Sequence, residues 1–165
     1  MVAEKIKAGF SLVELLIVIV IIGILTSISV LIYSKYKVYA YNSSALYDLK
    51  NLINDELSFF SIKQHFVSFS VSDINQDGTV KVDGFEHKYI SKYIRATSKT
   101  DGNYANFCTK HDMGNKIYAY QSETDTIYYK TSQQGYKLQD SDCPNATSGN
   151  DFSPEKGWKI LAQSK

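Results

Sequence analysis

A run of 21 residues, 12–32, contains a single charged side chain, that of Glu14. The other side chains are mostly those of leucine, isoleucine and valine. A helix of about 20 apolar residues is long enough to cross the hydrocarbon core of a membrane. Within a membrane, such a helix satisfies its backbone hydrogen bonds inside its own segment. The run therefore predicts a membrane-spanning helix near the N-terminus.

Gly9 and Glu14 distinguish this run from an ordinary secretory signal or signal anchor. A secretory signal has a small-residue cleavage site after its apolar core, whereas Gly9 comes before the core. A carboxylate inside a membrane is costly unless it is paired or neutralised, so Glu14 is a candidate functional residue. Cleavage after Gly9 would leave a free amine on Phe10, within reach of a carboxylate in the same chain or in a neighbouring one.

These residues resemble the class III leader and N-terminal helix of type IV pilins and type II secretion pseudopilins. The resemblance covers residues 5–33: a short charged leader, Gly9, Phe10, a glutamate four residues later and a long apolar helix. It implies that a prepilin peptidase cuts between Gly9 and Phe10 and that the new amine of Phe10 is methylated. It also implies that Glu14 pairs with this amine on a neighbouring subunit during assembly.

One departure from the family pattern concerns proline. Many members have a proline near the position of Leu31, but no proline precedes Pro144 in this chain. Gly23 is the only strongly helix-weakening residue of the apolar run. Local melting between Gly23 and Leu31 in a filament is therefore an alternative to a continuous helix.

A helical pattern continues beyond the apolar run. Apolar residues recur at steps of three and four, which is typical of a helix that packs one stripe on a core. These residues are Leu46, Leu49, Ile53, Leu57 and Phe60. We expect one helix over about residues 10–61, whose second half packs on an antiparallel β-sheet in an α+β fold. The resemblance identifies this arrangement with the ladle fold of type IV pilins.

Three regions are expected along the chain. Residues 1–9 would be a cleaved leader, residues 10–33 a transmembrane or filament-core helix, and residues 34–165 a periplasmic or extracellular globular domain. The 18 Lys+Arg and 17 Asp+Glu residues nearly balance, so no nucleic-acid partner is predicted. Tyrosines just past the apolar run predict an interfacial aromatic belt; they are Tyr33, Tyr36, Tyr39 and Tyr41.

The globular domain shows mainly the two-residue period of strands. Alternation predicts strands at residues 67–71 and 80–82, and residues 117–120 and 127–129 predict a hairpin. Further strands are expected near residues 136–138 and 157–161. A short helix is predicted from an i, i+4 pairing of Tyr89, Ile90, Tyr93 and Ile94.

Residues 73–78 match the first half of a calcium-binding loop, with oxygen ligands at alternate positions before Gly78. The candidate ligands are Asp73, Asn75, Asp77, the carbonyl of Thr79 and Asp83. Gly84 stands where the usual bidentate glutamate is expected, so Asp83 would bind with altered geometry. The same residues suit a metal-free turn equally well. Structural calcium is therefore one of two interpretations, and no cofactor is required.

Cys108 and Cys143 are the two cysteines of the chain. If this region is extracytoplasmic they are expected to form a disulfide, the alternative being two reduced thiols. In type IV pilins a disulfide near the C-terminus ties down a surface region, and the resemblance implies the same pairing here. Most major type II pseudopilins lack such a pair, which favours a pilin.

No arrangement of residues predicts an enzyme. His65, His87 and His111 lack metal-ligand spacing, and neither a Ser-His-Asp arrangement nor a glycine-rich phosphate loop is identifiable. Triplets at Asn42 and Asn145 match the N-glycosylation acceptor, which short triplets often do by chance.

The leading hypothesis is a structural subunit of a type IV pilus. The resemblance implies that copies of the chain leave the inner membrane with the help of the pilus assembly machinery and form a helical homopolymer on the cell surface. Adhesion and twitching motility would belong to the assembled fibre. The alternatives are a type II secretion pseudopilin in a periplasmic pseudopilus and a plain signal-anchored binding domain, which would make Gly9 and Glu14 accidental.

Overall fold

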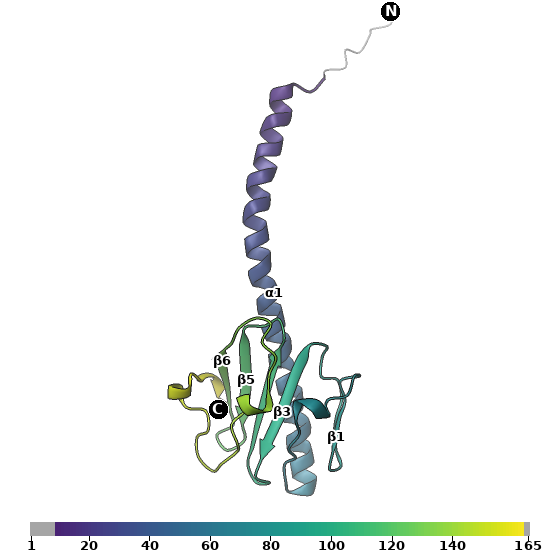
Figure 1. The fold of residues 1–165 in the computed structure, drawn as a ribbon, viewed down its shortest axis with the longest axis vertical. Helices are drawn as coiled ribbons and strands as arrows, with labels where there is room; N and C mark the ends of the chain where they lie inside the picture. The colour runs from purple at the N-terminus through teal and green to yellow at the C-terminus, as the bar shows by residue number, and fades with distance from the viewer. Residues whose placement is uncertain (1–8, 164–165) are drawn as a thin grey trace, which may run out of the picture. The chain divides into compact units, whose positions relative to one another are not determined.

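The structure of the protein, a computed structural model, describes residues 9–163 apart from the side chains of residues 31, 162 and 163. The chain divides into two compact units, Met1–Lys37 and Val38–Lys165, each held together by its own contacts. The first unit contains the apolar half of one long helix. The second contains the rest of that helix and the strands of the described residues (Figure 1).

Helix α1 comprises Leu12–Lys63, 52 residues, and confirms the helix predicted over about residues 10–61. It runs without interruption through Gly23. The helix closes at Gln64, which has a φ of +60° and donates its N–H to the carbonyl of Phe60 at 2.8 Å. Such a left-handed residue after the last turn is a common way to end a helix.

The second half of α1 packs an apolar stripe on the main sheet. Ala45, Leu49 and Leu52 are fully buried, and Glu56 occupies the next core position with no exposed surface. Leu57, which the sequence placed in this stripe, is 40% exposed. The buried row advances by four, three and four residues, so it keeps the predicted helical period but passes through Glu56 instead of Leu57.

Five antiparallel strands form the main sheet in the order β3-β4-β5-β6-β7 (Figure 1). Their bounds are Ile94–Thr100 for β3, Ala105–His111 for β4, Lys116–Gln121 for β5, Thr126–Thr131 for β6 and Lys159–Gln163 for β7. The predicted hairpin is confirmed as β5 and β6, and the predicted last strand as β7. Strands β3 and β4 were not predicted, because polar residues occupy buried positions in both and obscure the two-residue alternation.

A small two-stranded sheet lies outside the main one. It pairs β1, Val80–Val82, with β2, Phe85–His87, and confirms the strand predicted at residues 80–82. Asp83 and Gly84 join the strands with φ of +49° and +82°, as in the tight turns that two-residue hairpins favour. Three 3₁₀ turns complete the described elements: η1, Val71–Asp73; η2, Asp140–Asp142; and η3, Pro154–Lys156.

The short helix predicted around residues 89–94 is wrong. Tyr89 and Tyr93 have φ of +72° and +67°, and Ile94 begins β3. Ile90 and Ile94 are buried, whereas both tyrosines are exposed. Ile90 and Ile94 are four residues apart because an irregular segment contributes two side chains to the core. Periodicity alone cannot distinguish such a segment from one turn of helix.

The strand predicted at residues 67–71 has the expected burial but not strand pairing. Val67 and Phe69 are buried, yet only Phe69 forms a bridge, with Ser98 of β3. The hydroxyls of Thr97 and Ser98 donate to the carbonyls of Phe69 and Val67 at 3.0 and 2.8 Å. Side chains of the neighbouring strand thus replace part of the backbone ladder, and residues 71–73 turn into η1.

The main sheet is covered on both faces. Leu49, Phe107 and Tyr120 belong to the core beneath α1. A second core, formed with the C-terminal segment, comprises Cys108, Ile117, Ala119, Tyr128, Leu138, Cys143, Phe152 and Trp158. The predicted disulfide between Cys108 and Cys143 is present and fastens this segment to β4. The strand predicted near residues 136–138 is wrong, because Leu138 is buried there without strand pairing.

Candidate functional site

Helix α1 begins with a reciprocal cap formed by Ser11 and Glu14. The Ser11 N–H donates to Glu14 Oε2 at 2.9 Å, and the Val13 N–H donates to Ser11 Oγ at 3.2 Å. Such a cap provides partners for N–H groups that have none within the helix, and a carboxylate suits the positive end of the helix dipole. Sequence reasoning missed this second role of Glu14, although the Ser-x-x-Glu spacing of residues 11–14 signals it.

The capped carboxylate retains an oxygen for another donor. Of the two carboxylate oxygens of Glu14, only Oε2 accepts a hydrogen bond from a residue within 9–163. Gly9 is exposed and Phe10 is 84% exposed, so the peptide bond predicted to be cleaved, and the nitrogen predicted to be methylated, are on the surface. The rest of the predicted leader, residues 1–8, lies outside the described residues. The first turn therefore places an accessible carboxylate beside the expected new N-terminus.

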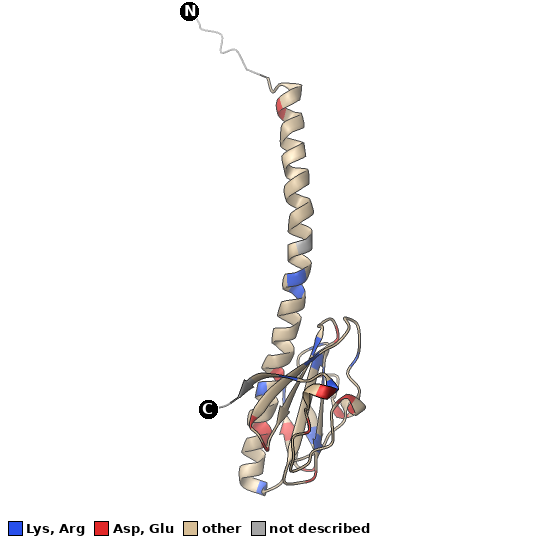
Figure 2. Ribbon diagram, turned by 90° about the vertical axis from the view of Figure 1, so that its left-hand side faces the viewer, with Lys and Arg blue, Asp and Glu red and all other residues tan. Residues whose placement is uncertain are grey.

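The apolar half of α1 is exposed throughout. Its large apolar side chains between Leu12 and Ile32, where described, are 48–82% exposed. By length and composition this part of the helix can cross a membrane. Figure 2 shows a long stretch of α1 without charged residues after its first turn. So much exposed apolar surface requires a lipid environment or other apolar helices around it.

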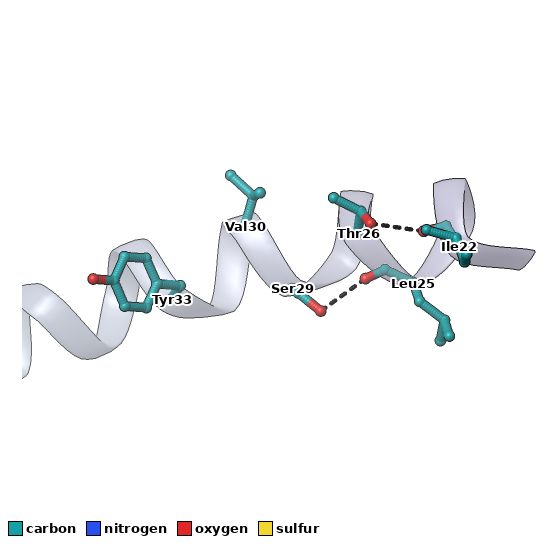
Figure 3. Close-up of a pocket in the computed structure, with 6 residues that line it drawn as sticks. All are labelled: Ile22, Leu25, Thr26, Ser29, Val30 and Tyr33. Atoms are coloured by element: carbon teal, nitrogen blue, oxygen red, sulfur yellow. Dashed lines mark hydrogen bonds between the residues drawn. The ribbon is translucent and has the colours of Figure 1, made fainter. Parts of the chain in front are cut away.

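Polar side chains within this stretch are satisfied internally. Thr26, Ser27 and Ser29 donate their hydroxyls to backbone carbonyls three or four residues earlier, at 2.7–2.8 Å. Figure 3 shows two of these bonds in a shallow hollow lined by Ile22, Leu25, Thr26, Ser29, Val30 and Tyr33. Because the hydroxyls bond within the helix, the surface needs no polar partner from its surroundings.

The four tyrosines of the predicted aromatic belt differ in their surroundings. Tyr33, Tyr36 and Tyr39 are each more than 60% exposed. The Tyr41 ring instead stacks on His111 of β4, with ring centroids 4.4 Å apart. Three of the four rings are therefore free to lie at a membrane surface or between subunits, and the belt stays a prediction.

Three of the candidate calcium ligands, Asp73, Asp77 and the carbonyl of Thr79, already accept hydrogen bonds within the loop. Asp73 Oδ2 accepts from the N–H and hydroxyl of Ser70, and these bonds lower the pKa of Asp73. The Thr79 N–H bonds to Asp77 Oδ1 at 2.9 Å and lowers the pKa of Asp77, while the Thr79 carbonyl accepts the Asn75 N–H. Asp83 belongs to the β1-β2 turn. No cluster of three or more acidic, His or Cys groups suited to a metal occurs within residues 9–163, although Asn75, Asp77 and Thr79 line one surface pocket.

Gly78 has a structural role in this loop. Its φ is +81°, and a Cβ at this position would lie 2.3 Å from the backbone oxygen of Ile90. The Gly78 carbonyl also accepts the Ile90 N–H at 2.9 Å. The glycine is therefore explained by a turn and by a close backbone approach without any metal.

Sequence reasoning did not predict the burial of several ionisable residues, among them Glu56 and Lys110. Glu56 accepts one hydrogen bond, from the Val67 N–H at 3.4 Å, and its Oε1 has no partner within the described part of the chain. Burial raises the pKa of Glu56 from 4.5 to about 8, so this carboxyl is protonated at neutral pH. Lys110 donates to the carbonyls of His111 and Gly114, each at 3.0 Å, and burial lowers its pKa.

Comparison with known proteins bears on the N-terminal region. A family model described as the prokaryotic N-terminal methylation motif matches residues 5–30. The type IV major pilin protein PilA of Myxococcus xanthus (strain DK1622) is 40% identical over 62 residues, which are 38% of this chain and 28% of that protein. The chain thus aligns with little more than a quarter of this relative. No solved structure matches the chain.

In its N-terminal region the chain resembles prokaryotic proteins with the N-terminal methylation motif, and its helix α1 is long and apolar enough to cross a membrane. Both matches support a type IV pilin or pseudopilin and do not distinguish the two. The long helix and the antiparallel sheets of the described residues form an α+β fold that is consistent with the ladle fold of pilins.

Proposed function

We propose that this chain is a structural, non-enzymatic subunit of a type IV pilus. A prepilin peptidase would cut between Gly9 and Phe10, and the amine of Phe10 would be methylated. The pilus assembly machinery would then transfer the subunit from the inner membrane into a helical homopolymer on the cell surface. The observation that carries this proposal is the exposed apolar half of α1, which begins at a turn containing the accessible carboxylate of Glu14.

Burial of the apolar half of α1 would drive assembly. In the membrane its side chains contact lipid, and in a filament they would contact the same helix of other subunits. Glu14 would pair with the Phe10 amine of a neighbouring subunit and set the axial register. The named relative is a major pilin, which supports the same role for this chain.

The mature N-terminus tests the processing step. Mass spectrometry of protein purified from the cell envelope should find chains that begin with N-methylated Phe10. Chains that retain Met1 and the charged leader would overturn both the pilus and the pseudopilus hypotheses and leave a plain signal anchor.

Shearing separates a pilus from a secretion pseudopilus. The Cys108–Cys143 disulfide favours the pilus, since most major pseudopilins lack such a pair. We expect the protein in long fibres released from the cell surface by shear. Recovery of processed protein only from the envelope, with no surface fibre, would instead favour the pseudopilin alternative.

We retain structural calcium only as a proposal in which the loop rearranges. Asp73 and the carbonyl of Thr79 would exchange their present hydrogen bonds for the ion. Calcium added to EDTA-treated protein would then raise its melting temperature, and Asp77→Asn would abolish the increase. An unchanged melting temperature would identify residues 73–79 as a metal-free turn.

A further inference from the structure

A polar groove of about 470 Å³ lies within the globular unit, between α1 and the segment that connects β2 to β3. Tyr47, Asn51 and Asp55 line it from α1, at positions close to one face of the helix. His87 and Tyr89 line it from the other side. Its volume is within the range of small-molecule binding sites, of about 300–1,000 Å³.

The groove contains several polar groups without protein partners. Within residues 9–163, no hydrogen bond engages the side-chain amide of Asn51 or Asn54. Asp55 uses Oδ2 to accept from His87 Nδ1 at 2.7 Å, and its other oxygen accepts no hydrogen bond from the same residues. Each amide offers two donors and a carbonyl acceptor, and the Asp55 oxygen adds another acceptor. The groove can therefore both donate to and accept from a ligand.

Two tyrosine rings flank these groups. Tyr47 is 64% exposed and Tyr89 is 78% exposed, and the other lining residues are polar or charged. The hydroxyls of both tyrosines have no hydrogen bond to any described residue. The groove thus combines two flat apolar surfaces with a polar floor.

The backbone conformation of Tyr89 is held by its neighbours. A φ of +72° is strained for an aromatic residue. The next two residues hold it there: Ile90 donates its N–H to the Gly78 carbonyl at 2.9 Å, and Ser91 donates its N–H and hydroxyl to the buried carboxylate of Asp48 at 2.7 and 3.0 Å. The backbone of this wall is therefore held by Gly78 and by Asp48 of α1 in advance of any ligand, which favours binding.

The side chains that line the groove limit the chemistry of a ligand. An anion would face Asp48 and Asp55, and the cation of the groove, Lys88, is already close to Glu86 at 3.6 Å. An apolar peptide or a lipid chain would find no aliphatic side chain among the lining residues. A ligand with flat apolar faces and hydroxyls that both donate and accept fits this combination.

We propose that this groove binds a short neutral oligosaccharide. The C–H faces of the sugar rings would stack on Tyr47 and Tyr89, and the sugar hydroxyls would bond to Asn51, Asn54 and Asp55. The site lies wholly within the globular unit, so the proposal does not depend on filament assembly.

Titration of the full-length chain with neutral oligosaccharides tests this site. The protein is held in micelles of a zwitterionic detergent without a sugar head group, and the probes are oligosaccharides of glucose, galactose and N-acetylglucosamine. Calorimetry should detect binding by the unmodified chain to at least one probe. Tyr89→Gly should weaken it at least about tenfold, because the ring is lost while the backbone strain is relieved.

Tyr93→Gly is the matched control, because Tyr93 also has a positive φ but does not line the groove. It should leave affinity unchanged, and both glycine variants should melt no lower than the unmodified chain. Asn51→Ala should weaken binding independently of any backbone effect. The proposal is overturned if no neutral probe binds with a Kd below about 10 mM, if an acidic oligosaccharide binds more tightly, or if Tyr93→Gly weakens binding as much as Tyr89→Gly.

Discussion

Replacing Glu14 with glutamine separates the two roles of its side chain. In the structure the carboxylate caps α1 by accepting the Ser11 N–H at 2.9 Å, and in the proposed filament it pairs with an amine. A glutamine carbonyl can accept the same backbone hydrogen bond, since glutamine also occupies this position of capping boxes. Glu14→Gln therefore keeps the cap and removes the charge. Ser11→Ala does the reverse, because it removes the acceptor of the Val13 N–H and leaves the carboxylate.

The two interactions differ enough in energy to be distinguished. Loss of an N-terminal cap costs about 1 kcal/mol. A carboxylate and an amine about 4 Å apart attract each other by about 4 kcal/mol at an effective dielectric constant of about 20. These energies correspond to about fivefold and roughly a thousandfold changes in an equilibrium constant. Glu14→Gln should therefore abolish fibres, whereas Ser11→Ala should lower their yield several-fold at most.

The assay compares sheared fibres with membrane-bound subunit for each variant. Mass spectrometry first confirms that both variants are cleaved before Phe10, since an unprocessed chain cannot report on pairing. Fibre yield from Glu14→Gln equal to that of the unmodified chain would refute the pairing role. If Ser11→Ala lost fibres as completely as Glu14→Gln, the helix cap and not the charge would be the essential function of this turn.

The remaining predictions concern the globular unit. Replacing Cys108 and Cys143 together with alanine should lower the free energy of unfolding by about 3–4 kcal/mol, measured by denaturant titration, because the bridge closes a long loop. Gly78→Ala should destabilise by more than about 2 kcal/mol, because a Cβ would meet backbone; Gly84→Ala, with φ +82° and open space, should cost about 1 kcal/mol. The pKa of Glu56 is raised from 4.5 to about 8, so the folded chain retains a proton that the unfolded chain loses above about pH 4.5. The free energy of unfolding should therefore fall as the pH rises from about 4.5 to about 8. Glu56→Gln should flatten this part of the curve of melting temperature against pH; an unchanged slope would show that Glu56 is not its source.

The N-terminal half of the molecule could be predicted from the sequence, because one strong physical signal determines it. Residues 12–32 are mostly apolar and contain one charged side chain, and after Gly23 the helical period continues without glycine or proline to Gln64. The structure accordingly has α1 over Leu12–Lys63. The β5-β6 hairpin and β7 were also found, because their apolar residues are grouped in short runs.

The segments that were mispredicted depend on contacts distant in sequence. Tyr89 has a positive φ where Ile90 and Ser91 are held by Gly78 and Asp48, contacts that no local pattern reveals. The groove beside Tyr89 shares this origin. Its two walls are about 40 residues apart in sequence, so the free amide of Asn51 becomes a candidate ligand only when the fold places it opposite Tyr89.

Burial of polar residues explains most of the other differences. A hydrophobic pattern treats glutamate and lysine as surface residues, yet Glu56 and Lys110 are fully buried. Glu56 can replace Leu57 in the stripe of α1 because desolvation keeps its carboxyl protonated, and a neutral carboxyl is far less costly to bury than a carboxylate. Lys110 is tolerated for another reason, since backbone carbonyls of His111 and Gly114 accept its hydrogen bonds. The ionisation state and the hydrogen bonds that decide burial arise only on folding, so the residue type alone could not have placed either side chain in the core.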